Sequence, residues 1–393
     1  MVDNTTGHYD IVIIGGGPVG MALALVLRDT GISSLLLEAR GLPEKFEDPR
    51  PLALSYGSHL ILHRLGAWDK LTQNTPITSI HISNRGSLGQ TILTPDDAGV
   101  PTLGFVVNYH DLFCSMHKKL TETKTDYIAG ATVTRLETNE SSGDVYFDYQ
   151  GKEEKITARL LILADGGQLA KQLPDITYQT HDYQQWAVVA NVSAEKKQTG
   201  IAYERFTADG PIALLPNGED FALVWTVAPG TAREIIALDD KTFLFRLHQH
   251  FGDRLGKFTK AGKRSAFPLS LKYATSITTQ RIVLIGNAAQ TLHPVAGQGF
   301  NLGLRDAYEL ACEIIDTKTA SNEIGAPAML SRYRQRRHID STAGRLFTDS
   351  LVKLFSKKSK TLKHACGFGL SALDCIPPLK RFIARRMIFG VRG

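Results

Sequence analysis

The chain has 393 residues, which is long enough for two or three structural units, each with a sizeable core. Hydrophobic residues make up 43% of it, slightly below the range of ordinary globular proteins, so the composition does not indicate a disordered chain. No stretch reaches the ~20 apolar residues of a membrane span, and the N-terminus has no signal-peptide pattern. We therefore expect a cytoplasmic protein.

Positive charge is concentrated near the C-terminus. Residues 349–393 contain ten Lys or Arg and two Asp, a sum of +8 in a chain whose net charge is +6. We expect this basic segment to be either a solvated helix face or a contact site for an anionic membrane surface or an acidic partner. Nucleic acid is not an expected partner, because no basic face is interleaved with stacking aromatic residues across a domain.

The first predicted elements form a β-α-β unit. Residues 9–14 are a short apolar run that predicts a buried parallel strand. Residues 18–30 have helical periodicity and stop at Gly31, and residues 33–38 predict a second apolar strand. The crossover between the two strands is expected to be right-handed.

Downstream of this unit the pattern changes and later returns to the parallel type. We predict, in chain order, a two-faced strand at 79–84, a helix at 109–121, a hairpin of strands 131–137 and 144–149, apolar strands at 160–164 and 281–285, and a helix from about 300 to 315. Between about residues 180 and 267 the strands are longer and are separated by Gly/Pro/Asn turns, which indicates an antiparallel sheet in a separate lobe. From Pro327 onward the chain is predicted to be helical.

These elements predict an α/β fold in which a Rossmann-like domain is interrupted by an antiparallel β-sheet lobe and followed by C-terminal helices. The expected boundaries are 1–75, 96–178 and 273–340 for the nucleotide domain, 76–95 and 179–272 for the lobe, and 341–393 for the basic helical C-terminal segment.

The first chemical motif is Gly15-x-Gly17-x-x-Gly20, between the first strand and its helix. Gly15 permits a tight turn, Gly17 lets the backbone approach a pyrophosphate, and Gly20 lets helix and strand pack closely. Glu38 ends the next strand, where its carboxylate can accept hydrogen bonds from ribose hydroxyls. The pattern predicts a site for an ADP-containing dinucleotide at a helix N-terminus, without separating FAD from NAD.

Two further motifs follow apolar strands. Asp165-Gly166 comes after residues 160–164, where it is either part of a ligand site at the carboxyl edge of the sheet or a plain turn. The segment 285–306 is more specific, because a strand ends at Gly286 and a Pro/Gly-rich loop leads into a helix. There Gly297 and Gly299 leave backbone amides free to approach a flat ligand, and the helix dipole favours negative charge on it, as on a reduced flavin.

In this order and spacing, the three motifs resemble those of the class A FAD-dependent monooxygenases, which have the para-hydroxybenzoate hydroxylase fold. The segments 203–206, 214–216 and 263–269, together with the third motif, are similar to the ubiquinone-biosynthesis hydroxylases, most of all to those that act on 2-polyprenyl-6-methoxyphenol. The similarity covers nearly the whole chain and is weakest in residues 310–393. Asn287 and Gln290, where the wider class has Asp and His, are typical of this branch.

The resemblance implies FAD as the cofactor and NAD(P)H as a transient co-substrate. The FAD-binding residues that it implies are Gly15, Gly17, Gly20, Glu38, Arg40, Arg50, Asp165, Gly166, Gly286, Asn287, Gly297, Gly299, Phe300 and Asn301. Asp165 and Gly166 would serve the pyridine nucleotide as well, although Leu169 and Gln172 replace the Ser and Arg that usually follow.

The implied chemistry is hydroxylation of a polyprenylated phenol by O2 through a flavin C4a-hydroperoxide. His293 and Pro294 are candidate catalytic residues beside the flavin, and Phe206, Trp225 and Phe267 are candidate substrate-pocket residues. For each of these, packing in a loop or in the core is the alternative role. No metal site is expected, because no cluster of metal ligands is visible in the sequence.

Two questions stay open at this point. The phenol is expected to be 2-polyprenyl-6-methoxyphenol, but a hydroxylase for another ring position of the same pathway would share these motifs. A non-catalytic, FAD-stabilised scaffold subunit of a ubiquinone-synthesis complex is a further alternative. A halogenase or disulfide reductase is disfavoured, since the chain lacks W-x-W-x-x-I-P, C-x-x-C and a second glycine motif.

Overall fold

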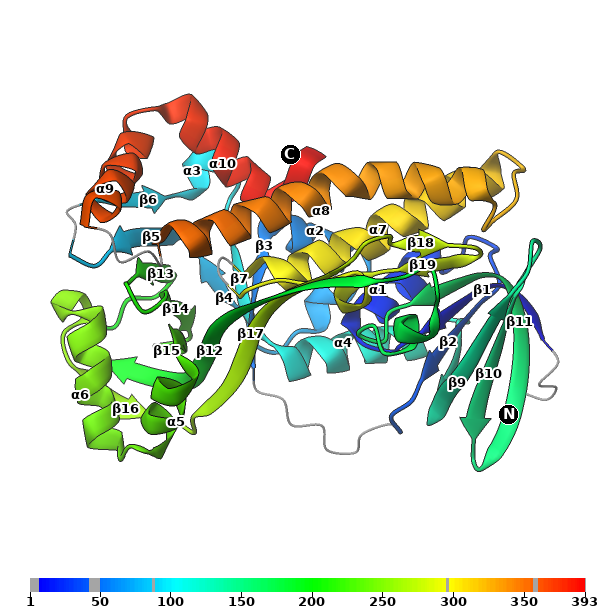
Figure 1. Ribbon diagram of the computed structural model, residues 1–393, viewed down its shortest axis with the longest axis horizontal. Coiled ribbons are helices and arrows are strands. Elements are labelled where there is room, and N and C mark those ends of the chain that lie inside the picture. Colours follow the sequence, from blue (N-terminus) through cyan, green and yellow to red (C-terminus); the bar gives the residue numbers. More distant parts are fainter. Residues whose placement is uncertain (1–6, 42–49, 87–88, 295–296, 356–359, 393) are drawn as a thin grey trace.

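The computed structural model describes residues 7–41, 50–86, 89–294, 297–355 and 360–392. Two large β-sheets and a group of C-terminal helices make up most of the molecule (Figure 1). The predicted fold class, a Rossmann-like domain with an inserted antiparallel lobe and C-terminal helices, is confirmed. The exact domain boundaries remain predictions.

The first sheet contains the N-terminal β-α-β unit. Its parallel strands lie in the order β19 (Ile282–Leu284), β11 (Lys152–Leu163), β1 (His8–Ile14), β2 (Ser34–Glu38) and β8 (Asp126–Ala129). Antiparallel β18 (Thr278–Thr279), β10 (Gly143–Tyr149) and β9 (Ala131–Thr138) complete it. Apolar side chains of β1 and β2 are buried on both faces, as expected of strands in a parallel sheet.

Helices cover one face of this sheet and form its larger core. They are α1 (Pro18–Leu27), α4 (Tyr109–Thr121) and α7 (Gln298–Thr319), with α8 (Pro327–Phe355) packed on α7. A small antiparallel sheet lies beside them, with the strands β3 (Pro51–Ser55), β7 (Gly104–Asn108) and β4 (Thr75–Ile77). Helix α2 (Tyr56–Arg64) follows β3 in the chain, and the short helix α3 (Pro95–Ala98) precedes β7.

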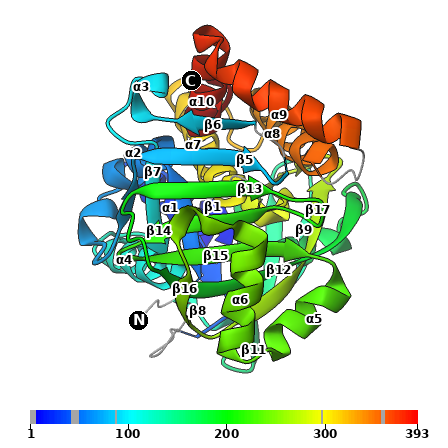
Figure 2. The same cartoon turned by 90° about the vertical axis from the view of Figure 1, so that its left-hand side faces the viewer.

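The second sheet is almost entirely antiparallel and forms the inserted lobe. Its strands are β20 (Gln290–Thr291), β17 (Ser265–Ala274), β12 (Tyr178–Ala194), β15 (Asp220–Val227), β14 (Ile212–Asn217), β13 (Ile201–Phe206), β5 (Ser79–Asn84) and β6 (Gln90–Leu93), with β16 (Phe258–Ala261) beside β12. Helices α5 (Pro229–Ala237) and α6 (Asp240–Phe251) cover one face (Figure 2). The other face is turned towards the helices at the end of the chain.

The chain ends in α8 and two further helices, α9 (Lys360–Asp374) and α10 (Pro377–Phe389). Helix α8 runs along the molecule to the lobe, where α9 lies against β5 and β6 (Figure 1). Helix α10 turns back and packs on α2 and α3. The C-terminal segment is therefore helical, as the sequence predicts, and it joins the two parts of the molecule.

Most predicted elements agree with the structure. The predicted strand 79–84 and helix 109–121 coincide with β5 and α4 at both ends. The predicted strand 160–164 is only the end of the longer β11, because the first half of that strand pairs with β10 and was too polar to be recognised. Helix α7 begins at Gln298, two residues before the predicted start, and extends to Thr319.

Candidate active site

Four predicted cofactor residues lie at one edge of the first sheet. Gly15, Glu38, Asp165 and Gly286 stand at or just after the carboxyl ends of β1, β2, β11 and β19. Because these strands are parallel neighbours, their ends meet at the same edge. Ligands of open α/β sheets bind at this edge, and the N-terminus of α1 opens onto it.

The glycines of the first motif differ in their surroundings. A Cβ at Gly15 or Gly20 would lie 2.6 Å or less from backbone atoms of the neighbouring turn and strand, and Gly15 has a φ of +112°. Gly17 caps α1 with an ordinary φ of −71°, and a Cβ there would meet nothing within 4 Å. Gly15 and Gly20 are thus required by the packing of the turn itself. Gly17 instead faces open space at the helix N-terminus, as a pyrophosphate site requires.

The carboxylate of Glu38 is held against the glycine turn. Its Oε2 accepts a hydrogen bond from the backbone N–H of Gly16 at 2.6 Å, and its Oε1 accepts from Nε of Arg40 at 2.8 Å. Burial acts to raise the pKa of Glu38, but the hydrogen bonds and charge of Arg40 outweigh it and lower the pKa below its ordinary value. Glu38 is therefore an oriented, ionised acceptor at the ribose position of the motif.

Asp165 supports its own turn. Its carboxylate accepts hydrogen bonds from the backbone N–H groups of Gly167 at 2.9 Å and Leu169 at 2.8 Å. The side chain therefore builds the turn, as one of the two alternatives from the sequence expects, and no atom lies within 4 Å of a Cβ position at Gly166. A ligand role for this motif stays a prediction. Asn287 is exposed in the 3-10 turn that follows β19, with its side chain available to a ligand hydroxyl.

The N-terminus of α7 forms the second half of the site. Gly297 caps the helix with a left-handed φ of +60°, and Gly299 has no atom within 4 Å of a Cβ position. The side chain of Asn301 makes four hydrogen bonds: it donates to the carbonyls of Ala53 and Gly297 and accepts from Ser55 N–H and the Ser58 hydroxyl. Asn301 thereby ties strand β3 to this helix end, and only its backbone remains for a cofactor.

The remaining arginine, Arg50, precedes β3 and is exposed. Its guanidinium lies 5.3 Å from the ring centre of Tyr109, and its carbonyl accepts the N–H of that residue. The residues at the two helix N-termini fit FAD: glycines without a crowded Cβ position border the space where a phosphate and a flat ring would lie, and Glu38 is ready to accept from ribose.

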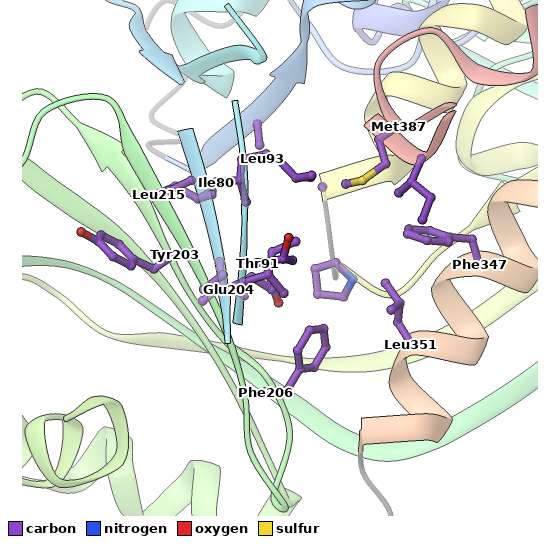
Figure 3. A pocket seen from close by; sticks show the side chains of 18 of the residues that line it. Ile80, Thr91, Leu93, Tyr203, Glu204, Phe206, Leu215, Phe347, Leu351 and Met387 are labelled. Carbon is purple, nitrogen blue, oxygen red and sulfur yellow. The ribbon is translucent and has the colours of Figure 1, made fainter. Parts of the chain in front are cut away.

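A large apolar cavity adjoins the N-terminus of α7 (Figure 3). Its volume is about 780 Å³, at the upper part of the range for small-molecule sites. Its walls come from β3, the lobe strands β5, β6, β13, β14 and β15, the start of α7, and helices α8, α9 and α10. Representative lining residues are Leu93, Phe206, Phe300, Leu351 and Met387.

Among the three predicted substrate residues, only Phe206 lines this cavity. Trp225 is 1% exposed and lies in the core on the opposite face of the sheet, with its ring 6.4 Å from that of Phe243 in α6. Phe267 is 43% exposed and is also absent from the wall. Successive side chains of a strand alternate between faces, so Trp225 points to α6 while its neighbour Val224 points to the cavity. The structure therefore does not place Trp225 or Phe267 at this cavity, in contrast to the predicted substrate-pocket role, which no contact of either residue supports.

The two candidate catalytic residues have different positions. Pro294 is exposed to the cavity and lines it. The imidazole of His293 is 1% exposed and packs edge-on against the ring of Tyr183, with 5.2 Å between ring centres. Burial lowers the pKa of His293 to about 4, so the ring is neutral near pH 7. A catalytic role for either residue remains a prediction.

The buried His293 makes stability depend on pH. The unfolded chain takes up a proton near pH ~6.5, but the folded chain does so only near the lowered pKa of about 4. Acid therefore favours unfolding. The contribution of neutral His293 to the free energy of unfolding is present above pH ~6.5 and is lost as the pH falls towards 4. Between roughly pH 7 and pH 5 the free energy of unfolding of the wild type should fall, and in His293→Gln this fall should be smaller by about 2 kcal/mol. Urea titrations at the two pH values measure the difference. An unchanged pH dependence would contradict this expectation.

The sequence reasoning missed several residues at the site. Glu204 lines the cavity from β13, and helices α8 to α10 supply about a third of the wall. Asp306 is buried and accepts the N–H of Gly286 at 3.1 Å, which fixes the turn after β19. The sequence signal for Asp306 was its position as the acidic residue that ends the segment 285–306. Within the described residues, no group of three or more His, Cys, Asp or Glu is arranged to hold a metal.

A two-lobed fold with a dinucleotide cradle beside an apolar cavity is that of an FAD-dependent enzyme. Residues 8–343 match the model of the FAD binding domain family, and the chain belongs to this family. Ubiquinone hydroxylase UbiL of Rhodospirillum rubrum is 32% identical over 96% of this chain and 88% of its own. The 3-demethoxyubiquinol 3-hydroxylase of Escherichia coli is 28% identical over 96% and 97%, respectively. The chain is thus a member of the FAD-dependent ubiquinone-biosynthesis hydroxylases.

Solved structures support the fold. The p-nitrophenol 4-monooxygenase PnpA of Pseudomonas putida superposes with a TM-score of 0.79 and 15% identity, covering 99% of this chain and all of that one. PqsL of Pseudomonas aeruginosa, in complex with 2-aminobenzoylacetate, gives 0.76 and 18% identity over 92% of this chain and all of that one. At these identities the likeness shows the shared fold alone.

Proposed function

We propose that the protein hydroxylates the ring of a polyprenylated phenol, 2-polyprenyl-6-methoxyphenol, using FAD, NAD(P)H and O2. The observation that carries the proposal is the apolar cavity of about 780 Å³ that begins at the N-terminus of α7 and continues between the lobe sheet and helices α8 to α10. A phenol head group can lie near Pro294 and Phe300, and an isoprenoid tail matches the Leu, Ile and Met side chains of the farther walls.

The chain contributes binding, orientation and exclusion of water. When bound, FAD supplies the redox and oxygen-transfer chemistry. Gly15, Gly17, Gly20 and Glu38 would hold its ADP half, and the backbone amides after Gly297 would stabilise negative charge at its ring. The apolar walls of the cavity would exclude water from the space beside the bound cofactor.

The test uses the purified, FAD-loaded protein with NADH or NADPH and a short-tailed probe, 2-methoxy-6-prenylphenol. We expect the phenol to stimulate NAD(P)H oxidation and the product to contain one oxygen atom from isotopically labelled O2. Stimulated oxidation that yields only hydrogen peroxide, or no stimulation by any phenol of this type, would overturn the proposal and favour the scaffold alternative.

The ring position is a second, separable part of the proposal. The Escherichia coli relative is named for hydroxylation at position 3 of a demethoxyubiquinol, a different step of ubiquinone synthesis. Deleting the gene and identifying the precursor that accumulates distinguishes the two substrates. Accumulation of 2-polyprenyl-6-methoxyphenol would support this phenol as the substrate. Accumulation of a demethoxyquinol would instead show that the protein acts at the later hydroxylation step.

We further propose that helices α9 and α10 contact an anionic membrane surface. Phe368, Ile376 and Phe382 are 77%, 47% and 56% exposed, and Arg381 and Arg385 of α10 are exposed as well. Leu354 and Leu379 line the cavity and are still 42% and 44% exposed, so the cavity opens next to this surface. Apolar residues among cations suit the interface of a membrane with anionic lipids. Within the described residues, no helix has the length and hydropathy to cross a bilayer.

Replacing both Phe368 and Phe382 by serine is expected to weaken binding to vesicles that contain anionic phospholipid at least tenfold, because each buried aromatic ring contributes roughly 1.5–3 kcal/mol. The matched control is Phe245→Ser, since Phe245 is 60% exposed on α6 of the lobe. Sedimentation with vesicles measures the effect. Equal binding by the double variant and the control would reject the membrane contact and leave a protein partner as the occupant.

A further inference from the structure

Glu204 occupies the centre of the lobe wall of the cavity. It lies on β13, where its neighbours in register are Ile82 on β5 and Ala213 on β14. The row continues to Thr91 on β6 and Val224 on β15, and all five residues line the cavity. Figure 3 shows the Glu204 side chain leaving its strand on the cavity side, between those of Thr91 and Phe206.

The carboxyl group of Glu204 is isolated in this wall. Its Oε1 is buried and has no hydrogen-bond partner among the described residues. It is the only carboxyl group among the described residues that line the cavity. The nearest polar member of the row, Thr91, donates its hydroxyl to Asp374 of α9 at 2.6 Å, and Lys380 pairs with that aspartate from behind the wall.

The ionisable side chains nearest to Glu204 do not neutralise the charge of its carboxylate. Arg205 is the next residue on β13, so it projects from the opposite face of the sheet. Tyr203 projects there too and packs in the core under α6. Among the described residues that line the opposite wall, the only ionisable side chain is the thiol of Cys366 on α9, and burial raises the pKa of this thiol above its ordinary value.

Burial raises the pKa of Glu204 to about 7, so both protonation states are available near neutral pH. Glu204 is partly exposed, but a carboxyl oxygen that is buried without a partner destabilises the fold, and an apolar residue would fill the position at lower cost in free energy. A ligand that presents a hydroxyl group would provide the missing partner. The cavity thus offers one proton acceptor in otherwise apolar surroundings, a pattern typical of catalytic sites.

We propose that Glu204 accepts the hydrogen bond and then the proton of the substrate's phenol group; this inference rests on the proposed function. The phenolic O–H bond breaks, its electron pair stays on the phenol oxygen, and the proton moves to Oε1 of Glu204. The added electron density on the ring favours attack at the ortho and para carbons. The carboxyl returns its proton to solvent when the product leaves.

The central experiment compares the FAD-loaded wild-type protein with Glu204→Gln, which keeps shape and polarity but cannot take up a proton. With 2-methoxy-6-prenylphenol, we expect kcat to fall by about 10²- to 10⁴-fold. In the wild type, kcat/KM should rise with pH through the raised pKa of about 7, as the carboxyl ionises. In the variant this step should vanish, and activity should recover only as the phenol itself ionises near pH ~10.

A binding measurement that needs no turnover accompanies the kinetics. Wild-type protein should bind the phenol probe at least tenfold more tightly than its methyl ether, and Glu204→Leu should lose this preference. Glu219→Gln is the matched control, because Glu219 lies on an exposed turn of the same lobe and pairs with Lys197. FAD content of each variant reports whether the fold is intact, and Glu204→Asp should retain part of the pH dependence.

The outcomes separate this inference from the proposed function. A wild type that turns over phenols, with Glu204→Gln equal to it in kcat and pH profile, overturns the role of Glu204 alone. A wild type without phenol-dependent turnover overturns the proposed function, and equal binding of phenol and methyl ether then overturns the contact with Glu204 as well. A preference for the phenol that is lost in Glu204→Leu supports the contact in either case.

Discussion

Gly20→Ala is expected to cost the protein both its fold stability and its FAD, whereas Gly17→Ala is expected to cost it FAD alone. A methyl group at position 20 would lie 2.0 Å from the carbonyl oxygen of Gly15, inside the contact between α1 and the turn after β1. Such overpacking destabilises by about 1–3 kcal/mol or more, because buried backbone must move. At position 17 the methyl group meets no protein atom but enters the space where the pyrophosphate would lie.

Two measurements distinguish these effects. Thermal unfolding of the apoprotein should be unchanged for Gly17→Ala and lowered for Gly20→Ala. Titration with FAD should show at least tenfold weaker binding for Gly17→Ala, a difference of about 1.4 kcal/mol. Gly230→Ala on α5 is the control, because its Cβ position is equally open but belongs to the lobe. Normal FAD affinity of Gly17→Ala would contradict the assignment of the cofactor site.

Arg337→Met is expected to lower the free energy of unfolding by about 3–5 kcal/mol, because it leaves buried carboxylates without their cation. The Arg337 guanidinium is 3% exposed, and lies 2.6 Å from Asp306 and 2.7 Å from Asp340. Asp306 in turn accepts the N–H of Gly286, and Asp340 also pairs with Arg305 at 3.0 Å. This network joins α7 and α8 to the turn where the ribitol of FAD is expected to bind.

Arg334→Met provides the matched control, since Arg334 is exposed on the same helix and its loss should change stability by less than about 0.5 kcal/mol. Urea denaturation of the two variants gives the comparison. A double variant, Arg337→Met with Asp306→Leu, should regain part of the lost stability, because it also removes one of the uncompensated charges. Equal midpoints for the two single variants would show that the buried network contributes little.

The cofactor half of the site could be predicted because its determinants are local in the chain. Gly15, Gly17 and Gly20 lie within six residues, and Glu38 ends the strand that pairs with the one before them. A short motif between a strand and a helix determines where the backbone amides point, whatever the rest of the fold does. The same reasoning placed Gly297 and Gly299 in a loop that leads into a helix, and α7 begins at Gln298, between these two glycines.

The substrate half depends on contacts between distant segments. Thr91, Glu204, Leu351 and Met387 line one cavity although they are separated by more than 100 residues in most pairs, and no local pattern connects them. The face of β15 that meets the cavity is decided by which side α5 and α6 cover, so Trp225 could not be placed from its own strand. The C-terminal helices were recognised as basic, but their role as a wall of the cavity was not.

Local sequence patterns thus determined the α/β class, the glycine turn at the start of α1 and the glycine-rich start of α7 where the flavin is expected to bind, because hydrogen bonds and turns within a few residues specify them. Tertiary packing decided which side chains face the cavity and isolated Glu204 there, because the solvation of a carboxyl group depends on every segment that surrounds it.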